Sequence, residues 1–215
     1  MGTESVKFLE IHIQTGWRKV LADFAAWCAP QPGWATLDVG CGPGLLPALL
    51  GDHGCRAIGV DLTVSEFASE RLHPTLLQAD VFHLPFADGL FDLVTATNLL
   101  FLLDEPALAL RELKRVTRPN GQVALLNPSE KMSWEAAAGL ADQRGLSGLD
   151  RLSLLSWAEL AEIRCRWGEP ELCALFNAAG LSLNETALRV GPGLARFARG
   201  RPMYTPSFLK FHAKA

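Results

Sequence analysis

The chain has 215 residues, a formal net charge of −3, 49% apolar residues and 20% charged residues. This length accommodates one domain with a full core, and the composition is that of an ordinary folded globular protein. A small negative net charge gives no general attraction to nucleic acid or to an anionic membrane, so the expected partner is a small molecule or a protein.

The start of the chain and its cysteines indicate a cytoplasmic location. Residues 1–6 contain neither a basic stretch nor an apolar one, so no signal peptide is predicted. The longest apolar run, residues 99–103, is too short to span a bilayer. The five cysteines form no Cys-x-x-Cys pair, which argues against a disulfide scaffold and against a zinc site.

Apolar residues recur at helical spacing in residues 8–29, and this pattern ends at the breaker Pro30–Gly33. A strand, a helix and a second strand follow and form a β-α-β unit of about thirty residues. Strands are predicted at residues 34–39, 56–61, 76–80, 91–96, 122–127, 181–190 and 207–213. Helices are predicted at residues 45–53, 65–72, 106–116 and 170–179, and residues 191–206 are expected to form a loop.

This alternation of strands and helices predicts a parallel sheet that is covered by helices on both faces. Right-handed crossovers then give a doubly wound α/β fold. Folds of this class bind their ligands at the carboxyl ends of the strands. Candidate binding residues are therefore expected at those ends.

The stretch Asp38-Val39-Gly40-Cys41-Gly42-Pro43-Gly44 joins the first predicted strand to its helix. Three glycines at every second position remove three Cβ atoms, so a ligand can approach the backbone closely and positive φ values cost little. The turn lies at a helix N-terminus, where free N–H groups and the helix dipole favour an anionic group. Asp61 ends the second strand, where a carboxylate can accept hydrogen bonds from the hydroxyls of a ribose.

Two cofactor classes satisfy a glycine turn followed by such an acid, namely a dinucleotide and S-adenosylmethionine. A dinucleotide turn requires a third glycine at the position where this chain has Leu45. Asp38 would also repel a pyrophosphate, whereas it suits the ammonium of a methionyl group. The residues favour S-adenosylmethionine, and an NAD-dependent oxidoreductase is the less favoured alternative.

The same stretch resembles the first motif of class I S-adenosylmethionine-dependent methyltransferases, within the group that contains the ubiquinone and menaquinone biosynthesis C-methyltransferases. The resemblance covers about residues 34–127, with a generic pair of strands near 181–213, and it is carried further by residues 59–61, 78–86, 91–94 and 113–121. It implies a Rossmann-like, seven-stranded, mostly parallel sheet with an antiparallel last strand.

The whole chain is expected to form a single methyltransferase domain, residues 1–215. Its parts are an N-terminal helical segment (1–33), a cofactor-binding core (34–128), a helical cap insertion (129–169) and a C-terminal helix with strands (170–215). The acceptor pocket is expected between the N-terminal helix and the cap, where aromatic side chains could stack on a flat or apolar acceptor. An alternative is that these side chains only fill the cap's own small core. They are Trp17, Met132, Trp134 and Trp157.

The resemblance implies that the glycine turn passes beneath the methionyl and ribose moieties, with Asp38 and the backbone near Cys41 at the methionyl end. Asp61 would bind the ribose hydroxyls, and Leu62 would pack on the adenine. Cys41 is interpreted as a small residue in a tight turn, without a nucleophilic role.

At the adenine end, Asp80 would accept a hydrogen bond from the N6 amino group, and the Val81 N–H would donate to a ring nitrogen. Asn98 would bind the methionyl group or the acceptor, unless it is only a turn residue. The cofactor-binding residues that follow from the resemblance are Asp38, Gly40, Cys41, Gly42, Gly44, Asp61, Leu62, Asp80, Val81 and Asn98.

Methyl transfer from a sulfonium is an SN2 displacement with a neutral leaving group, so the enzyme mainly aligns and desolvates the reactants. The resembled group often carries an acid and histidines after the fourth strand, where this chain has Asn98 and Phe101-Leu102. No catalytic base and no metal ligand is therefore predicted. The chain is interpreted as a small-molecule methyltransferase, monomeric or homodimeric, and an S-adenosylmethionine-binding regulatory protein without catalysis is the alternative.

The end of the sequence is basic, with no acid after Glu185. Such a segment could form a rim that attracts an anionic acceptor, or simply a solvated face, and it lacks the aromatic interleaving of a nucleic-acid groove. Its basic residues are Arg189, Arg196, Arg199, Arg201, Lys210 and Lys214.

Overall fold

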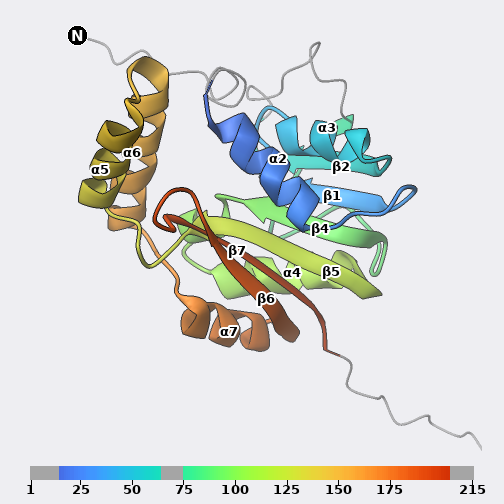
Figure 1. Cartoon of the computed structure of the whole chain (residues 1–215). Helices are drawn as coiled ribbons and strands as arrows, with labels where there is room; N and C mark the ends of the chain where they lie inside the picture. The colour runs from blue at the N-terminus through green and yellow to red at the C-terminus, as the bar shows by residue number, and fades with distance from the viewer. Residues whose placement is uncertain (1–14, 64–74, 204–215) are drawn as a thin grey trace, which may run out of the picture.

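The structure is a computed structural model that describes residues 15–63 and 75–203. Its centre is a seven-stranded sheet with the order β3-β2-β1-β4-β5-β7-β6 (Figure 1). Strand β7 is antiparallel to both of its neighbours, while the pairs among β1 to β5 are parallel. The predicted Rossmann-like sheet with an antiparallel last strand is thus confirmed. The strands are β1 (Ala35–Val39), β2 (Arg56–Asp61), β3 (Thr75–Gln78), β4 (Phe91–Thr97), β5 (Thr117–Pro128), β6 (Leu181–Arg189) and β7 (Ala195–Pro202).

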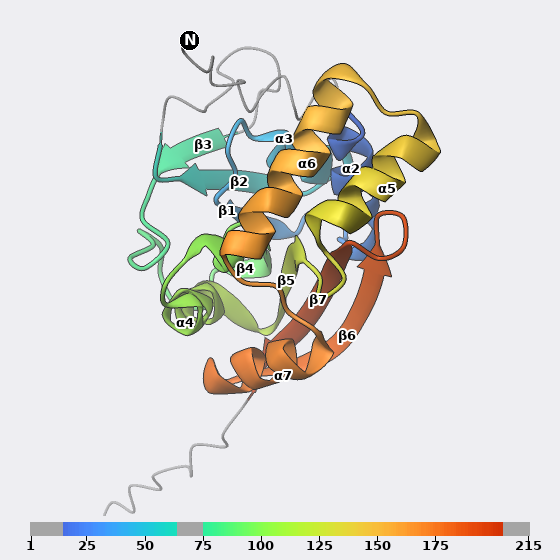
Figure 2. The ribbon, with the colours of Figure 1, turned by 90° about the vertical axis from the view of Figure 1, so that its left-hand side faces the viewer.

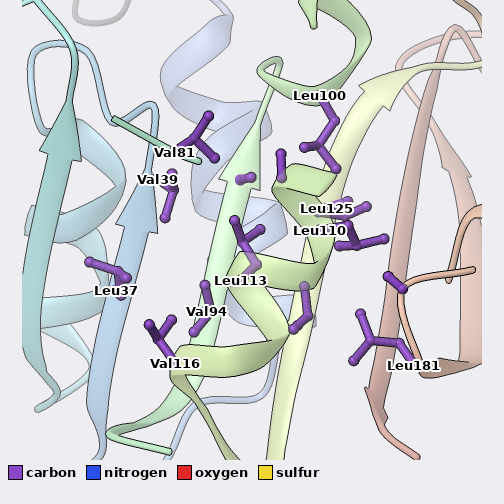
Figure 3. Packing of buried hydrophobic residues seen from close by; sticks show 14 of the residues in the cluster. Leu37, Val39, Val81, Val94, Leu100, Leu110, Leu113, Val116, Leu125 and Leu181 are labelled. Carbon is purple, nitrogen blue, oxygen red and sulfur yellow. The ribbon is translucent and has the colours of Figure 1, made fainter. Parts of the chain in front are cut away.

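Helices cover both faces of the sheet (Figures 1 and 2). On one face, α2 and α3 bury Phe24 and Leu46 in a cluster with Phe197 of the sheet. On the other face, α4 packs Leu110 and Leu113 over the strands together with α7 (Figure 3). The helices are α2 (Trp17–Trp27), α3 (Leu45–Asp52), α4 (Pro106–Val116), α5 (Trp134–Arg144), α6 (Gly148–Ile163) and α7 (Glu169–Ala178), and the 3₁₀ helix η2 (Leu100–Leu102) follows β4.

Consecutive residues of β5 serve the two faces in turn. Val123 and Leu125 belong to the cluster under α4, whereas Ala124 and Leu126 belong to the cluster under α2 and α3. Because neighbouring side chains of a strand point to opposite faces, a strand covered on both sides is apolar throughout. This is why the continuous apolar run in the sequence correctly predicts a buried strand.

The helices α5 and α6 form the expected helical cap at one end of the sheet, where α6 crosses in front of the strands in Figure 2. Ser133 caps α5 by accepting a hydrogen bond from the Ala136 N–H at 3.0 Å. Met132 and Phe101 are fully buried in the cluster that joins the cap to η2. Since η2 follows β4 and the cap follows β5, the cap lies over the carboxyl ends of these strands.

The expected loop at residues 191–206 is wrong in its middle, because Ala195–Pro202 forms β7. Arginines obscure the strand in the sequence, but acids from other elements neutralise them. Arg196 binds Glu130 at 2.7 Å, and the Arg199 Nε donates to Glu185 at 2.9 Å. The strand predicted at residues 207–213 and the helix predicted at 65–72 lie outside the described residues.

Strand β5 begins at Thr117, five positions before the predicted strand at residues 122–127. Residues 118–121 contain proline and glycine, which in the sequence mark the end of the helix predicted at 106–116. Gly121 fits because a Cβ there would lie only 2.9 Å from the Asp92 carbonyl oxygen, and Arg118 forms an ion pair with Asp92. In residues 15–63 and 75–203, no helix is both long and apolar enough to cross a membrane.

Candidate functional site

The glycine turn leaves the carboxyl end of β1 and leads directly into α3. Gly40, Gly42 and Gly44 have φ values of 71°, 50° and 87°, a region that only glycine adopts at little cost. The N–H groups of Gly40 and Cys41 both donate to the Val60 carbonyl, at 2.8 and 3.0 Å. The backbone of the turn is thereby fixed against the end of β2.

Asp61, the last residue of β2, binds the turn with its side chain. Its Oδ2 accepts a hydrogen bond from the Gly42 N–H at 2.9 Å, and its Oδ1 accepts one from the Thr63 N–H at 3.0 Å. Each carboxylate oxygen can accept a further hydrogen bond, and the residue is only half-buried. Asp61 is therefore available to ribose hydroxyls while it holds the turn, a second role that the sequence did not predict.

Asp38 lies on β1 immediately before the turn, and its residue is only 1% exposed. Its Oδ1 accepts a hydrogen bond from the Thr95 hydroxyl at 2.7 Å, whereas its Oδ2 is buried and has no partner. Burial raises the pKa of Asp38 from 3.8 to about 7; the Thr95 hydrogen bond opposes this shift, and the charge of Asp61 adds to it. A ligand ammonium at Oδ2 would stabilise the ionised carboxylate.

The second predicted acid, Asp80, follows β3. Its Oδ1 accepts a hydrogen bond from the Phe82 N–H at 2.9 Å, and its Oδ2 lies 3.7 Å from the His83 Nδ1. Leu62 is 65% exposed, whereas Val81 is buried in the core (Figure 3). Leu62 and Asp80 follow the neighbouring strands β2 and β3, so an exposed apolar side chain and an exposed carboxylate lie at adjacent strand ends, a combination that suits the flat, polar-edged ring of adenine.

Asn98 follows β4 with a φ of 52°, a left-handed conformation that asparagine adopts more readily than most residues. Its N–H donates to the Leu126 carbonyl at 2.8 Å, and its side-chain Oδ1 is buried without a partner. The next residue, Leu99, lies 3.1 Å from the position that a Cβ on Gly40 would take. The loop after β4 therefore lies against the glycine turn, as the predicted site requires.

Several buried polar side-chain atoms have no hydrogen-bond partner in the structure. Each such group costs about 1–3 kcal/mol, so native proteins keep few of them. Four of the residues concerned lie at the carboxyl ends of β1, β4 and β5 or on the cap helix α6, which makes this end of the sheet the candidate binding site. Those found in the described ranges are Thr36 Oγ1, Asp38 Oδ2, Asn98 Oδ1, both amide atoms of Asn127, and Trp157 Nε1.

Asn127 and the exposed orientation of Trp134 were not anticipated. Trp134 is 51% exposed. Met132 is fully buried in the cap cluster, so Met132 fills the cap's own core, as the alternative stated above has it. Trp157 packs edge to face on Trp17, with the ring centroids 5.2 Å apart. This contact holds α6 against α2, which are the two elements expected to enclose the acceptor.

The basic end of the chain does not form the suggested rim at three of its positions. Arg189 lies 3.3 Å from Asp23, and Arg196 and Arg199 bind the acids described above. Arg201 is exposed, and Lys210 and Lys214 lie outside the described residues. The charge of the three paired arginines is compensated locally, which leaves them little attraction for an anionic acceptor.

Cys41 is 4% exposed, and burial raises the pKa of its thiol, so it stays protonated at neutral pH. Its side chain fills a narrow space beside β2. A Cβ on Gly59 would lie 2.8 Å from the Cys41 Sγ, 2.9 Å from Pro47 and 2.7 Å from Leu76. Cys41 therefore packs the base of the turn, in agreement with its interpretation as a small structural residue.

Replacing Gly59 by alanine is expected to destabilise the protein by about 1–3 kcal/mol, because the added methyl group overpacks this contact. Gly51→Ala is the matched control, since a Cβ there meets nothing within 4 Å and alanine favours the helix α3. Urea denaturation of both variants measures the effect. A Gly59→Ala variant as stable as the wild type would contradict the tight packing described for Cys41.

Comparison with known proteins finds similarity to methyltransferases over part of the chain. Residues 37–125 match the family model described as a methyltransferase domain. The malonyl-[acyl-carrier protein] O-methyltransferase of Enterobacter lignolyticus is 32% identical over 110 residues, which cover 47% of this chain and 44% of that protein. The demethylmenaquinone methyltransferase of Lactobacillus johnsonii is 31% identical over 147 residues, 60% of this chain and 59% of that protein. The matches thus span about half the length of these curated relatives.

Solved structures show the same fold. The magnesium protoporphyrin IX methyltransferase of Synechocystis PCC 6803, with bound S-adenosylhomocysteine, superposes with a TM-score of 0.61 at 18% identity, covering 94% of this chain and 90% of that chain. A methyltransferase from Aquifex aeolicus gives a TM-score of 0.60 at 21% identity, covering 85% and 87%. The chain thus has the sheet order and the fold of these methyltransferases, and its residues 37–125 are similar to a methyltransferase domain.

Proposed function

We propose that the protein transfers the methyl group of S-adenosylmethionine to a small-molecule acceptor. The observation that carries this proposal is the glycine turn between two carboxylates with different surroundings. Asp61 is half-buried and can accept hydrogen bonds from ribose hydroxyls, whereas Asp38 has a buried, unpartnered Oδ2 that suits an ammonium. The residues therefore fit this cofactor, and the turn at residues 40–44 brings its backbone close to the ligand.

The adenine and the methionyl group have separate proposed contacts. At the adenine, Leu62 packs on the ring, Asp80 accepts from the N6 amino group, and the Val81 N–H donates to a ring nitrogen. At the methionyl end, the backbone near Cys41 and the Asn98 side chain complete the site. These assignments are supported by the strand-end positions of Asp61 and Asp80, since the register pairs Asp61 with Gln78 and so brings the ends of β2 and β3 together.

The reaction that this site supports is direct displacement, without a base from the loop after β4. Residues 97–103 contain no titratable side chain, so the acceptor has to present a nucleophile that needs no deprotonation by this loop. A sulfonium carries a neutral leaving group, so alignment and exclusion of water supply most of the catalysis. The cap over the strand ends is placed to exclude water.

Calorimetry and a transfer assay test this function. The protein is expected to bind S-adenosylhomocysteine with micromolar affinity and to show no binding of NAD. Binding of NAD without binding of S-adenosylhomocysteine would favour the oxidoreductase alternative. Binding of S-adenosylhomocysteine, with no transfer of a labelled methyl group to any member of a broad metabolite panel, would favour the non-catalytic regulatory protein.

We further propose that the protein acts on small molecules as a monomer or homodimer and that it is located in the cytoplasm. Its five cysteines are unpaired in the structure, which supports a reducing compartment. The names of the relatives give different acceptors, malonyl-[acyl-carrier protein] in one and demethylmenaquinone in another, so the acceptor class has to come from the chain's own residues.

A further inference from the structure

Asn127 contributes two of the unpartnered polar atoms at this end of the sheet. The residue is 2% exposed and lies at the end of β5, and neither its Oδ1 nor its Nδ2 has a hydrogen-bond partner. A primary amide offers one acceptor oxygen and one NH₂ donor. Both kinds of group are therefore unsatisfied in one buried side chain.

The sheet register places Asn127 between two other polar residues. The Asn98 N–H donates to the Leu126 carbonyl at 2.8 Å, which in a parallel pair puts Asn98 beside Asn127 across β4 and β5. On the other side, Asn127 is paired with Arg196 of β7. Two amides with buried, unpartnered atoms thus occupy adjacent strand ends. Asn98 also directly precedes Leu99, whose side chain lies against Gly40 of the glycine turn.

The neighbouring cation is already compensated. Arg196 Nη2 binds Glu130 at 2.7 Å, and its Nη1 donates to Thr186 at 3.2 Å and lies 3.7 Å from Glu169. The preceding strand residues, Leu125 and Leu126, are fully buried and apolar. Arg196, the cation paired with Asn127 across the sheet, is therefore occupied by acids, and a neutral hydrogen-bonding group suits this position.

We propose that Asn127 anchors the methyl acceptor through a pair of hydrogen bonds, and that the acceptor presents an adjacent N–H and C=O, as in a lactam or a carboxamide. This inference rests on the proposed methyltransferase function. An isolated carbonyl or a carboxylate would satisfy Nδ2 and leave Oδ1 unpaired, whereas a lactam edge satisfies both. A site built around a hydrogen bond discriminates strongly against analogues that lack the partner group.

The probe is 2-pyridone, a small lactam, added to the ¹⁵N-labelled full chain saturated with S-adenosylhomocysteine. Its controls are N-methyl-2-pyridone, which keeps the carbonyl and lacks the N–H, and phenol, which lacks the carbonyl. The Asn127 side-chain NH₂ signals are identified by their loss in Asn127→Leu. We expect 2-pyridone to shift these signals saturably and to bind about tenfold more tightly than either control, or than it binds to Asn127→Leu.

Asn184→Leu is the matched variant, because Asn184 is exposed on β6, and it should leave 2-pyridone binding unchanged. Asn127→Leu is expected to melt no lower than the wild type, since it removes two unpaired buried groups. Equal affinity of the wild type for 2-pyridone and N-methyl-2-pyridone would overturn the inference, and this comparison needs no variant. No binding of 2-pyridone, or equal binding to wild type and Asn127→Leu, would also overturn it and leave Asn127 with a buried water only. Failure of S-adenosylhomocysteine to bind would instead overturn the proposed function itself.

Discussion

Replacing Asp61 by alanine is expected to weaken the binding of S-adenosylhomocysteine by about 1–3 kcal/mol, which is about 5- to 150-fold in the dissociation constant. Two losses combine in this variant. The ribose hydroxyls lose the charged acceptor that we propose for them, and the Gly42 N–H loses the carboxylate oxygen that holds it at 2.9 Å. Ordering the turn when the ligand binds then costs free energy, which lowers the affinity further.

Isothermal titration with S-adenosylhomocysteine measures the change in affinity. Asp52→Ala is the matched control, because Asp52 is exposed at the end of α3 and should bind no ligand. Asp61→Asn is expected to be nearly as damaging as the alanine variant, since its NH₂ group would face one of the two backbone N–H donors. An Asp61→Ala variant with wild-type affinity would remove Asp61 from the proposed ribose site.

Hydrogen exchange separates the two contributions of Asp61. Without ligand, the Gly42 amide should exchange faster in Asp61→Ala than in the wild type, whereas the amides of Gly40 and Cys41, which donate to Val60, should be little changed. Faster exchange at Gly42 with unchanged affinity would mean that the carboxylate only braces the turn.

Local patterns made the centre of the fold predictable. The strand, glycine turn and helix around residues 35–52 need no distant contact to be recognised, since the positive φ values of Gly40, Gly42 and Gly44 are typical of glycine. Asp61 follows from the β-α-β unit, because adjacent parallel strands bring their carboxyl ends together. The number of strands and the antiparallel last strand, however, came from the family resemblance and not from the residues alone.

The missed strand β7 depends on contacts that no local pattern contains. Its arginines lie in a sheet only because Glu130 and Glu185, from other parts of the chain, bind Arg196 and Arg199. Gly200 is required by β6, since a Cβ there would overlap the Ser182 carbonyl oxygen. The sequence of such a strand predicts a polar loop as long as its partners in the sheet are unknown.

Asn127 was missed for a related reason. In the sequence it is one polar residue at the end of an apolar run, a common way for a strand to end. Its significance comes from full burial without a hydrogen-bond partner, which is a property of the packed structure. Asp38 shows the same limit, because its position before the turn was predicted but the lack of a partner for its Oδ2 was not.

The second large effect concerns Asp38 and the pH dependence of stability. The pKa of Asp38 is about 7 in the folded protein and 3.8 without the influence of burial. Between these pH values the folded state holds a proton that the unfolded state has lost. The contribution of Asp38 to the free energy of unfolding therefore falls as pH rises towards 7 and levels off above pH 7. Asp38→Asn cannot ionise, and its Oδ1 can still accept the Thr95 hydrogen bond. The variant is therefore expected to match the wild type near pH 4 and to exceed its stability above pH 8 by a few kcal/mol, at most about 4.

Urea denaturation at pH 4 and pH 8.5 measures this difference, with Asp52→Asn as the exposed control whose stability should track the wild type at both values. Ligand binding should respond in the opposite direction. A ligand ammonium favours the ionised carboxylate, so the affinity of the wild type for S-adenosylhomocysteine should rise between pH 6 and pH 8, and Asp38→Asn should lose both this rise and most of the affinity. A less stable Asp38→Asn at pH 8.5 would mean that the folded protein stabilises the charge. A more stable variant that binds poorly would show that the buried carboxylate is kept for its ligand, at a cost to the stability of the free protein.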